Sequence, residues 1–372
     1  MERAISYLGE VFPLETPEWS AWSANKRPAR LEGTWIISGH EPGKGPLYGT
    51  MMISVDPRDA NVFKTTSSYV YAESGEQIQR TGQTTVYTGY QWRGRSNPGS
   101  DDELREVMFV ERDQQQIWGR WFSGDYDEIG PNISMKRAVG STIVTGVHPR
   151  AILQGSSTDV TVYGVGLSES EALDFGSGIS VESMNEIDDG ALRVTLHVAE
   201  NTGLGGRDLH TNGSIAEDAV VVHNGVDRIE VTPGTGSARA GGAHFPKGYQ
   251  IFDAWGFDDG PDGEPNTGDD LDLGRIDVSW HLEEYAATYG DDDIDFVGEI
   301  QQDGRFVPAA DGPNADRSGN RNNIGDVWVV ATYGSGDAAI SARAHLVVMP
   351  LLYMRWEPWA EIETRPRPIG GS

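Results

Sequence analysis

The 372-residue chain carries 29 Lys and Arg against 57 Asp and Glu, which gives a formal net charge of −28. Such an acidic surface repels phosphate backbones and anionic lipid, so binding to nucleic acid or to a membrane surface is disfavoured. The length exceeds that of one compact core and predicts two or three domains.

Cysteine is absent from the sequence. The chain therefore has no disulfide, no thiolate nucleophile, no Cys-ligated zinc or iron–sulfur cluster, and no C-x-x-C-H site for haem attachment. The first twelve residues show no apolar segment after a basic start, so we expect no signal peptide. The best apolar run, 346–354, is too short to span a bilayer, and we expect no membrane insertion.

The sequence of residues 1–30 is typical of a connector that leads into the first domain. One or two helical turns give way to Pro13, Pro17 and Pro28, which stop regular structure. Trp19 and Trp22 lie outside any strand pattern in this connector, so we expect another surface to cover them.

Residues 31–138 predict a single antiparallel β-barrel. A Gly33-Thr34-Trp35 opening precedes seven or so short β-prone runs separated by turn signals, a pattern that resembles lipocalin-like up-and-down barrels. Three of these runs are 62–66, 68–72 and 84–92. By the same resemblance, we expect the Arg120 guanidinium to lie against the Trp35 ring. We expect the barrel aromatics to fill its interior rather than to line a ligand cavity. These aromatics are Tyr69, Tyr71, Tyr87, Tyr90, Trp92, Trp118 and Trp121.

Residues 140–226 and 227–354 predict two immunoglobulin-like β-sandwiches, so the fold class is all-β. The first alternates short strands with Gly- and Ser-rich turns, and the second ends in a hairpin formed by 325–333 and 340–348. An extended tail rich in Pro and Gly, 355–372, carries Trp356 and Trp359 and is expected to fray unless it docks on a partner.

The final sandwich contains an unusual acidic stretch. We expect a well-buried strand at 249–257 and a strand with roughly alternating apolar residues at 271–280, on either side of an acidic loop, 258–270. A second acidic turn at Asp291, Asp292 and Asp293 leads to a strand at 294–300. Long acidic loops between aromatic strands point to function.

A calcium site is the more specific of two interpretations of the loop 258–270, and a solvated or interfacial turn is the other. Asp258, Asp262 and Asp269 fall at positions one, five and twelve of an EF-hand-like register. The match is degraded, because Gly260 occupies position three, position twelve lacks Glu, and flanking helices are absent. We therefore predict a solvated or interfacial turn and no metal site.

No catalytic constellation is evident. The sequence has no G-x-S-x-G elbow and no phosphate-binding loop, and nothing singles out a pair of carboxylates for glycoside hydrolysis. We predict no catalytic or cofactor-binding residue on this chain.

Several segments carry a family resemblance. They are 89–94, 119–122 and 126–130 in the barrel, 238–242, and 249–317 in the last sandwich. Together they resemble the quinohemoprotein amine dehydrogenase alpha subunit, in the family's domain order, over nearly all of 5–353. The specificity comes from accumulated Trp, Gly and Pro positions rather than from a short signature.

The resemblance implies a periplasmic complex that oxidises primary amines to aldehydes and ammonia. In the family, a small gamma subunit carries the cysteine tryptophylquinone, a β-propeller beta subunit lies beside it, and two c-type haems occupy an N-terminal alpha domain. That haem domain has no counterpart in this sequence, so the chain corresponds to domains II to IV, as a fragment or as a haem-free relative. No family catalytic residue is carried over, because the quinone and its base belong to gamma.

Two functions compete at this point. The first is a non-catalytic scaffold that holds quinone-bearing and β-propeller subunits. The second is a stand-alone secreted adhesion or glycan-binding protein, periplasmic or extracellular in either case, and an unrecognised hydrolase is a third alternative. Candidate partner-interface residues are Trp19, Trp22, Trp255, Phe306, Trp356 and Trp359, with a core position as the alternative for Trp255 and Phe306.

Overall fold

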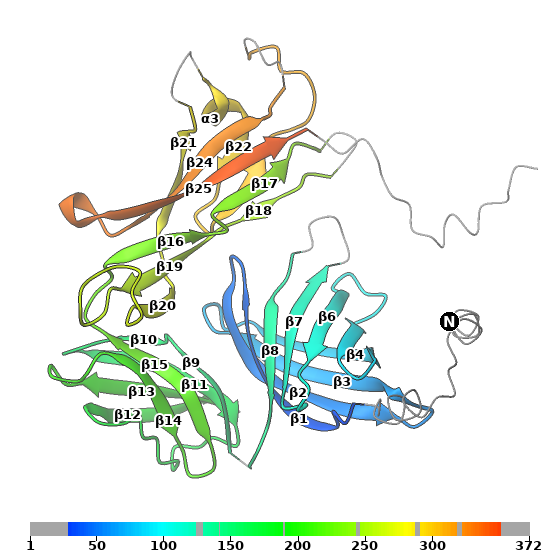
Figure 1. The fold of residues 1–372 in the computed structure, drawn as a ribbon, viewed down its shortest axis with the longest axis vertical. Helices are drawn as coiled ribbons and strands as arrows, with labels where there is room; N and C mark the ends of the chain where they lie inside the picture. The colour runs from blue at the N-terminus through cyan, green and yellow to red at the C-terminus, as the bar shows by residue number, and fades with distance from the viewer. Residues whose placement is uncertain are drawn as a thin grey trace, which may run out of the picture. The chain divides into compact units, whose positions relative to one another are not determined.

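The computed structural model describes residues 29–123, 129–140, 142–188, 190–242, 246–286, 291–317 and 322–350. The protein is nearly all β, with 60% strand, which confirms the predicted fold class (Figure 1). Two compact units are distinguished. The first runs up to Ile229 and includes Trp255–Ile276, and the second holds Glu230–Ala254 and the residues from Asp277 onward.

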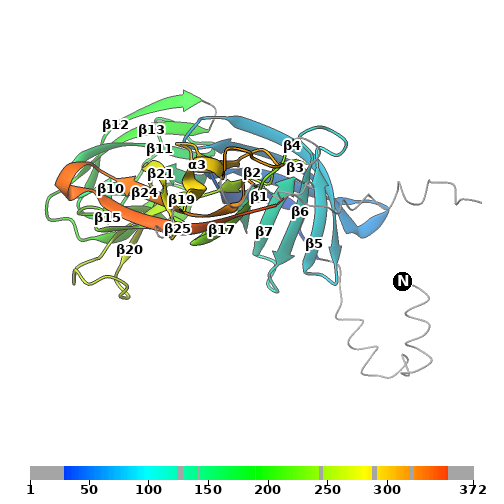
Figure 2. The ribbon, with the colours of Figure 1, turned by 90° about the horizontal axis from the view of Figure 1, so that it is seen from above.

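Eight strands close an antiparallel barrel in chain order (Figures 1 and 2). They are β1 (Gly33–Glu41), β2 (Gly45–Asp56), β3 (Asp59–Tyr71), β4 (Gln77–Tyr87), β5 (Gln91–Ser96), β6 (Leu104–Val110), β7 (Gln116–Ser123) and β8 (Asn132–Arg137). Buried and exposed residues alternate along the strands, so every second side chain enters the barrel. The interior is a continuous core that includes Trp35, Trp92 and Trp121.

The aromatic residues of the barrel divide between its two faces. Tyr69, Tyr71, Trp92 and Trp121 are buried inside, as predicted. Tyr87 and Trp118 are instead exposed on the outer face, and Tyr90 packs against the core only in part. The alternation of side chains along a strand explains the difference. Trp118 and Trp121 are an odd number of positions apart on β7, so their side chains point to opposite faces.

The strand bounds also differ from the prediction. The expected strands at 62–66 and 68–72 are one continuous strand, β3, and the expected strand at 84–92 is divided by a turn between β4 and β5. At this turn Thr88 and Gly89 both have positive φ. Such backbone conformations end a strand whatever the hydrophobicity of its neighbours.

The predicted contact between Arg120 and Trp35 is wrong. Arg137 of β8 supplies the guanidinium instead, 4.6 Å from the Trp35 ring, and Arg137 pairs with Trp35 across β1 and β8. The Trp35 indole donates to the Leu31 carbonyl at 2.8 Å. Arg120 is exposed on the outer face of β7, whereas the Trp35 ring is fully buried inside the barrel.

The middle of the first unit is a two-layer sandwich. One sheet has the order β12 (Ile179–Asp188), β13 (Ala191–Val198), β11 (Ser157–Val165) and β9 (Ile143–His148). The other has the order β10 (Ala151–Leu153), β15 (Ile215–His223) and β14 (Gly205–His210). Side chains from both sheets, such as Val160, Leu196 and Val222, share one buried core.

The remaining strands form three further sheets, of three, four and three strands. Their orders are β16 (Arg228–Thr232), β19 (Asp253–Asp258) and β20 (Leu271–Arg275); then β17 (Thr235–Arg239), β25 (Ile340–Met349), β24 (Gly325–Tyr333) and β21 (Ser279–Glu284); then β18 (Gln250–Ile251), β23 (Arg305–Pro308) and β22 (Gly298–Ile300). The predicted hairpin is confirmed as β24 and β25.

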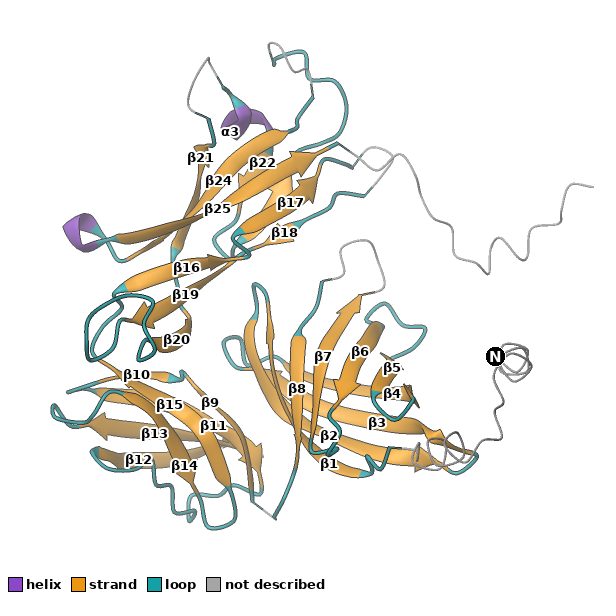
Figure 3. Cartoon of the chain, in the orientation of Figure 1, coloured by secondary structure: helices purple, strands orange, loops and turns teal. Residues whose placement is uncertain are grey.

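Three predicted strands of this region are interrupted. The stretch 249–257 divides into β18 and β19, which belong to different sheets, and 271–280 divides into β20 and the start of β21. The stretch 294–300 contains the one-turn helix α3 (Asp293–Phe296) before β22. In the described part of the chain, α3 and the 3-10 turn η1 (Gly336–Ala338) are the helical segments (Figure 3).

Candidate functional site

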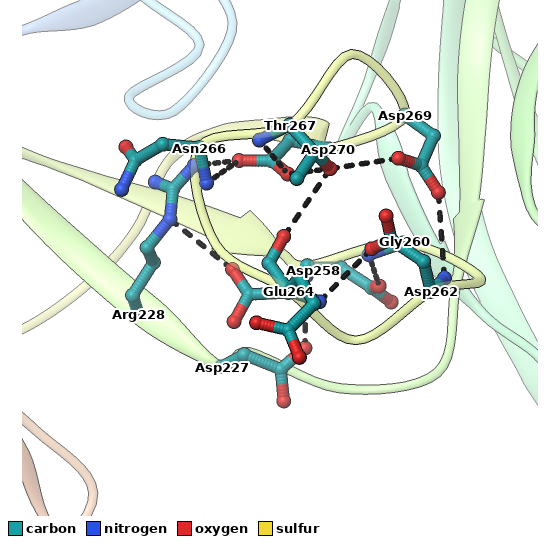
Figure 4. Close-up of polar contacts among 11 residues, drawn as sticks. Asp227, Arg228, Asp258, Gly260, Asp262, Glu264, Asn266, Thr267, Asp269 and Asp270 are labelled. Atoms are coloured by element: carbon teal, nitrogen blue, oxygen red, sulfur yellow. Dashed lines mark hydrogen bonds and ion pairs between the residues drawn. The ribbon is translucent and has the colours of Figure 1, made fainter.

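The acidic loop between β19 and β20 is organised around Arg228, the first residue of β16 (Figure 4). Its Nε lies 3.1 Å from Asp259 Oδ1, and its Nη2 pairs with Asp270 Oδ2. The guanidinium also lies 4.1 Å from the centre of the Phe257 ring. One cation therefore ties both ends of the loop to the sheet that carries it.

The aspartates of this loop bind backbone amides. Asp258, which is fully buried, accepts hydrogen bonds from the N–H groups of Asn224 and Gly260, each at 2.8 Å. Asp262 Oδ1 accepts from the N–H of Glu264 at 2.9 Å. Asp and Asn side chains that bond an amide two residues later define Asx turns, which fix a loop without regular structure.

Hydrogen bonding also sets the charge of Asp270. Burial opposes ionisation, but hydrogen bonds from Arg228 and from the N–H groups of Thr267 and Asn266 hold the pKa of Asp270 below its usual value. The carboxylate is therefore charged at neutral pH and remains paired with Arg228.

The three aspartates of the EF-hand-like register do not converge on one point. Asp258 faces Asn224 and Gly260, whereas Asp269 Oδ1 accepts from the Thr267 hydroxyl at 2.7 Å. The geometry is that of a hydrogen-bonded loop, and the predicted absence of a metal site stays a prediction.

A second acidic cluster lies at α3. Among the described residues, the carboxylates of Asp291, Asp292 and Asp293 form a group whose ligand atoms lie within 4.8 Å of one another. Arg317 occupies this group: its Nε lies 3.0 Å from Asp292 Oδ1 and its Nη2 pairs with Asp293 Oδ1. Asp293 Oδ2 also accepts from the N–H of Asp326 at 2.7 Å. A cation of the chain itself therefore occupies the cluster and balances one of its three negative charges.

A buried carboxylate inside the barrel was missed by the sequence analysis. Glu106 of β6 is 2% exposed, and its Oε2 accepts from the Trp92 indole at 2.8 Å. Burial raises the pKa of Glu106 to about 7. Gly94 on β5 makes the space, because a Cβ there would lie 2.5 Å from Glu106 Oε2. The only sequence signal was parity, since Glu106 shares its face with Met108 and Val110.

The candidate partner-interface residues have different surroundings. Trp255 is half-buried, with its ring 5.1 Å from that of His40, so its role as an anchor stays a prediction. Phe306 is fully buried in the core of its unit, which agrees with the core alternative given for it, because its alternating position on β23 points inward. Trp19, Trp22, Trp356 and Trp359 lie outside the described residues.

Comparison with protein families decides the relationship. Residues 28–138 match the quinohemoprotein amine dehydrogenase alpha subunit domain II, 141–224 match domain III, and 229–359 match domain IV. The chain belongs to the quinohemoprotein amine dehydrogenase alpha-subunit family. The resemblance carried by the Trp, Gly and Pro positions of the sequence is thereby confirmed.

Other comparisons add no argument about this family member. No curated protein matches the chain. A redesigned β-barrel is similar at 15% identity, with 29% of this chain and 91% of that structure covered and a TM-score of 0.23. The extracellular cadherin domains 1–5 of protocadherin gamma B2 are similar at 10% identity, with 87% of this chain and 73% of that structure covered and a TM-score of 0.23. SGBP-B of the Bacteroides ovatus mixed-linkage glucan utilization locus, in complex with a mixed-linkage heptasaccharide, is similar at 12% identity. The match covers 85% of this chain and 60% of that structure, with a TM-score of 0.25.

The cofactors of the amine dehydrogenase family do not fit the residues of this chain. Attachment of haem c needs cysteine thioethers, and a cysteine tryptophylquinone needs a cysteine by definition. The sequence contains none. In the part of the chain that the structure describes, no helix has the length and apolar character needed to cross a membrane.

Proposed function

We propose that the chain is a non-catalytic scaffold of a quinohemoprotein amine dehydrogenase-like complex that oxidises primary amines to aldehydes. In this role it holds a small quinone-bearing subunit and a β-propeller subunit in the periplasm. The observation that carries the proposal is the succession of alpha-subunit domains II, III and IV over residues 28–359, in the family's order.

The contacts of the charged residues support a structural role. Arg228 and Arg317 each bind two carboxylates, and the loop aspartates are used by backbone amides. Glu106, whose pKa would suit a proton acceptor at neutral pH, is enclosed in the barrel core. A general base must reach the proton it removes, and an enclosed carboxylate does not meet that requirement.

The test is purification of the chain alone and from its native source. Alone, it is expected to be colourless and to show no amine-dependent dye reduction, because its sequence has no cysteine for either cofactor. From the native source, it is expected to copurify with a haem protein and a small quinone-containing chain. Haem or quinone absorbance from the chain alone, or a native protein that purifies without partners, would contradict the proposal.

A further inference from the structure

The outer face of β5, β6 and β7 carries a basic and aromatic grid. These strands are neighbours in the barrel (Figure 2). Three successive rows of outward-facing residues cross them. From β5 to β7 the rows are Gln91, Phe109 and Trp118; Arg93, Val107 and Arg120; and Arg95, Arg105 and Phe122. We call these nine residues the arginine grid. It contains four arginines and no carboxylate, in a chain with 57 acidic residues.

The arrangement of charge within the arginine grid opposes folding. Arg95 and Arg105 are directly opposite each other across β5 and β6, and like charges in that position destabilise a sheet. Arg95 has one acidic neighbour at the rim of the grid, Glu103, at 3.1 Å. Arg105 forms no ion pair with any residue that the structure describes. A partner that brings negative charge to this face removes the repulsion.

The arginine grid also offers apolar contact. Trp118 is 50% exposed and Val107 is exposed beside it, while the Phe109 ring lies 5.6 Å from that of Trp118. A shallow groove of about 390 Å³ adjoins the grid on the β4 side. Its lining residues are Gln83, Thr85, Arg93, Gly94, Arg95 and Pro98. Arg, Trp and Phe next to a groove form the composition typical of the centre of a protein interface.

We propose that the arginine grid is the docking surface for an acidic partner protein. This rests on the proposed function and deepens it: the partner is a subunit of the complex, and its contacting surface carries carboxylates. Charge complementarity selects this occupant. A nucleic acid presents a continuous row of phosphates, which the net charge of −28 repels beyond the grid, whereas a protein can match separate arginines with separate carboxylates.

The experiment compares two double variants of equal charge in binding to the isolated partner subunits. Arg93→Glu with Arg105→Glu reverses charge in the grid, and Arg193→Glu with Arg343→Glu makes the same change on exposed strand positions of β13 and β25. We expect the grid variant to weaken binding at least about tenfold and to lose most of the salt dependence, while the control binds as the wild type does. Trp118→Ala is expected to weaken binding with the salt dependence unchanged.

The outcomes separate this proposal from the proposed function. If the wild-type chain binds the subunits and the grid variant binds them equally well, the docking surface is refuted and the scaffold function stands. If the wild-type chain binds neither subunit, the scaffold function is refuted and the docking surface with it. A heparin oligosaccharide that binds the grid while the subunits bind elsewhere would also refute the proposal. Melting temperatures equal to or above that of the wild type show that the grid variant is folded.

Discussion

Two acidic clusters in this protein each gather around a single arginine, but at different depths. The Arg317 side chain is 3% exposed and binds Asp292 and Asp293, whereas the Arg228 side chain is 19% exposed and binds Asp259 and Asp270. Arg317 also donates to two backbone carbonyls, at 2.7 and 2.8 Å. The pairing therefore acts differently in the two clusters: Arg317 balances the buried carboxylate of Asp293 in the core, whereas the more exposed Arg228 holds one conformation of its loop.

The largest expected effect comes from removing the buried arginine. Arg317→Met leaves Asp293 buried without its cation, so we expect the second unit to lose about 3–5 kcal/mol of unfolding free energy. Chemical denaturation measures it. Arg343→Met is the matched control, an exposed arginine in the same unit whose guanidinium lies 4.3 Å from the Trp328 ring. Equal losses for the two variants would show that the burial of Arg317 and its pair with Asp293 do not account for the effect.

A second variant keeps this test informative if Arg317→Met fails to fold. Adding Asp293→Asn removes the charge that the arginine balanced, and it should recover part of the lost stability. No recovery would mean that the lost hydrogen bonds to the carbonyls of Asn322 and Ile324 account for the effect.

A carboxylate buried without an arginine sharpens the comparison. The pKa of Glu106 is about 7 in the folded chain, against 4.5 for an ordinary Glu, so the native state holds an extra proton between these pH values. The contribution of Glu106 to stability is fully present below about pH 4.5 and is lost as the pH rises towards about 7. Glu106→Gln should remove this dependence and stabilise the barrel at pH 8 by on the order of 3 kcal/mol.

The measurement for Glu106 is unfolding free energy as a function of pH. Glu103→Gln is the control, because Glu103 is partly exposed and paired with Arg95. A wild-type curve that rises through this pH range, relative to the Glu106→Gln curve, would contradict the assigned direction.

Removing the shallower arginine is expected to act locally. Arg228→Met should lower the melting temperature of the first unit by about 2–4 °C, because the pair it breaks is only partly shielded from water. Proteolysis within residues 259–270 should accelerate, since Arg228 ties both ends of that loop. An unchanged cleavage rate would show that the aspartate–amide hydrogen bonds alone fix the loop.

Calcium is expected to have no effect on the stability of the protein. Millimolar calcium or a chelator should leave the melting temperature unchanged, because the carboxylates of Asp258 and Asp269 already accept hydrogen bonds from the chain. A bound ion at a hundredfold excess over its dissociation constant would add about 2.7 kcal/mol. A clear calcium-dependent rise in melting temperature would show that the loop 258–270 is a metal site. The loop would then differ from the Arg317 cluster, whose carboxylates are paired with an arginine.

The sequence predicted the all-β class and the barrel because alternation and turn residues are local signals. It failed where local hydrophobicity disagreed with topology. Strand β12 is polar along most of its length and was not recognised, although it forms the edge of a sheet and packs Ile179 and Met184 against the core. The apolar residues of the stretch 249–257 predicted one buried strand, yet β18 and β19 join different sheets there.

The site was harder to predict than the fold, because it depends on which distant residues meet. Arg228 precedes its partner Asp270 by 42 positions, and no spacing rule connects them. The choice of Arg120 rather than Arg137 as the partner of Trp35 failed for the same reason. Only the pairing of β1 with β8 places Arg137 opposite the indole, and that pairing is a property of the closed barrel.

The seam between β1 and β8 has a consequence for synthesis of the protein. Trp35 and Arg137 are roughly 100 residues apart in sequence, so β1 is made first and keeps one unpaired edge until β8 has been made. An unpaired strand edge is a template for association with other chains. The nascent barrel therefore passes through a stage at which it is complete in seven strands and still open to aggregation, and a chaperone that shields β1 during that interval would raise the yield of folded protein.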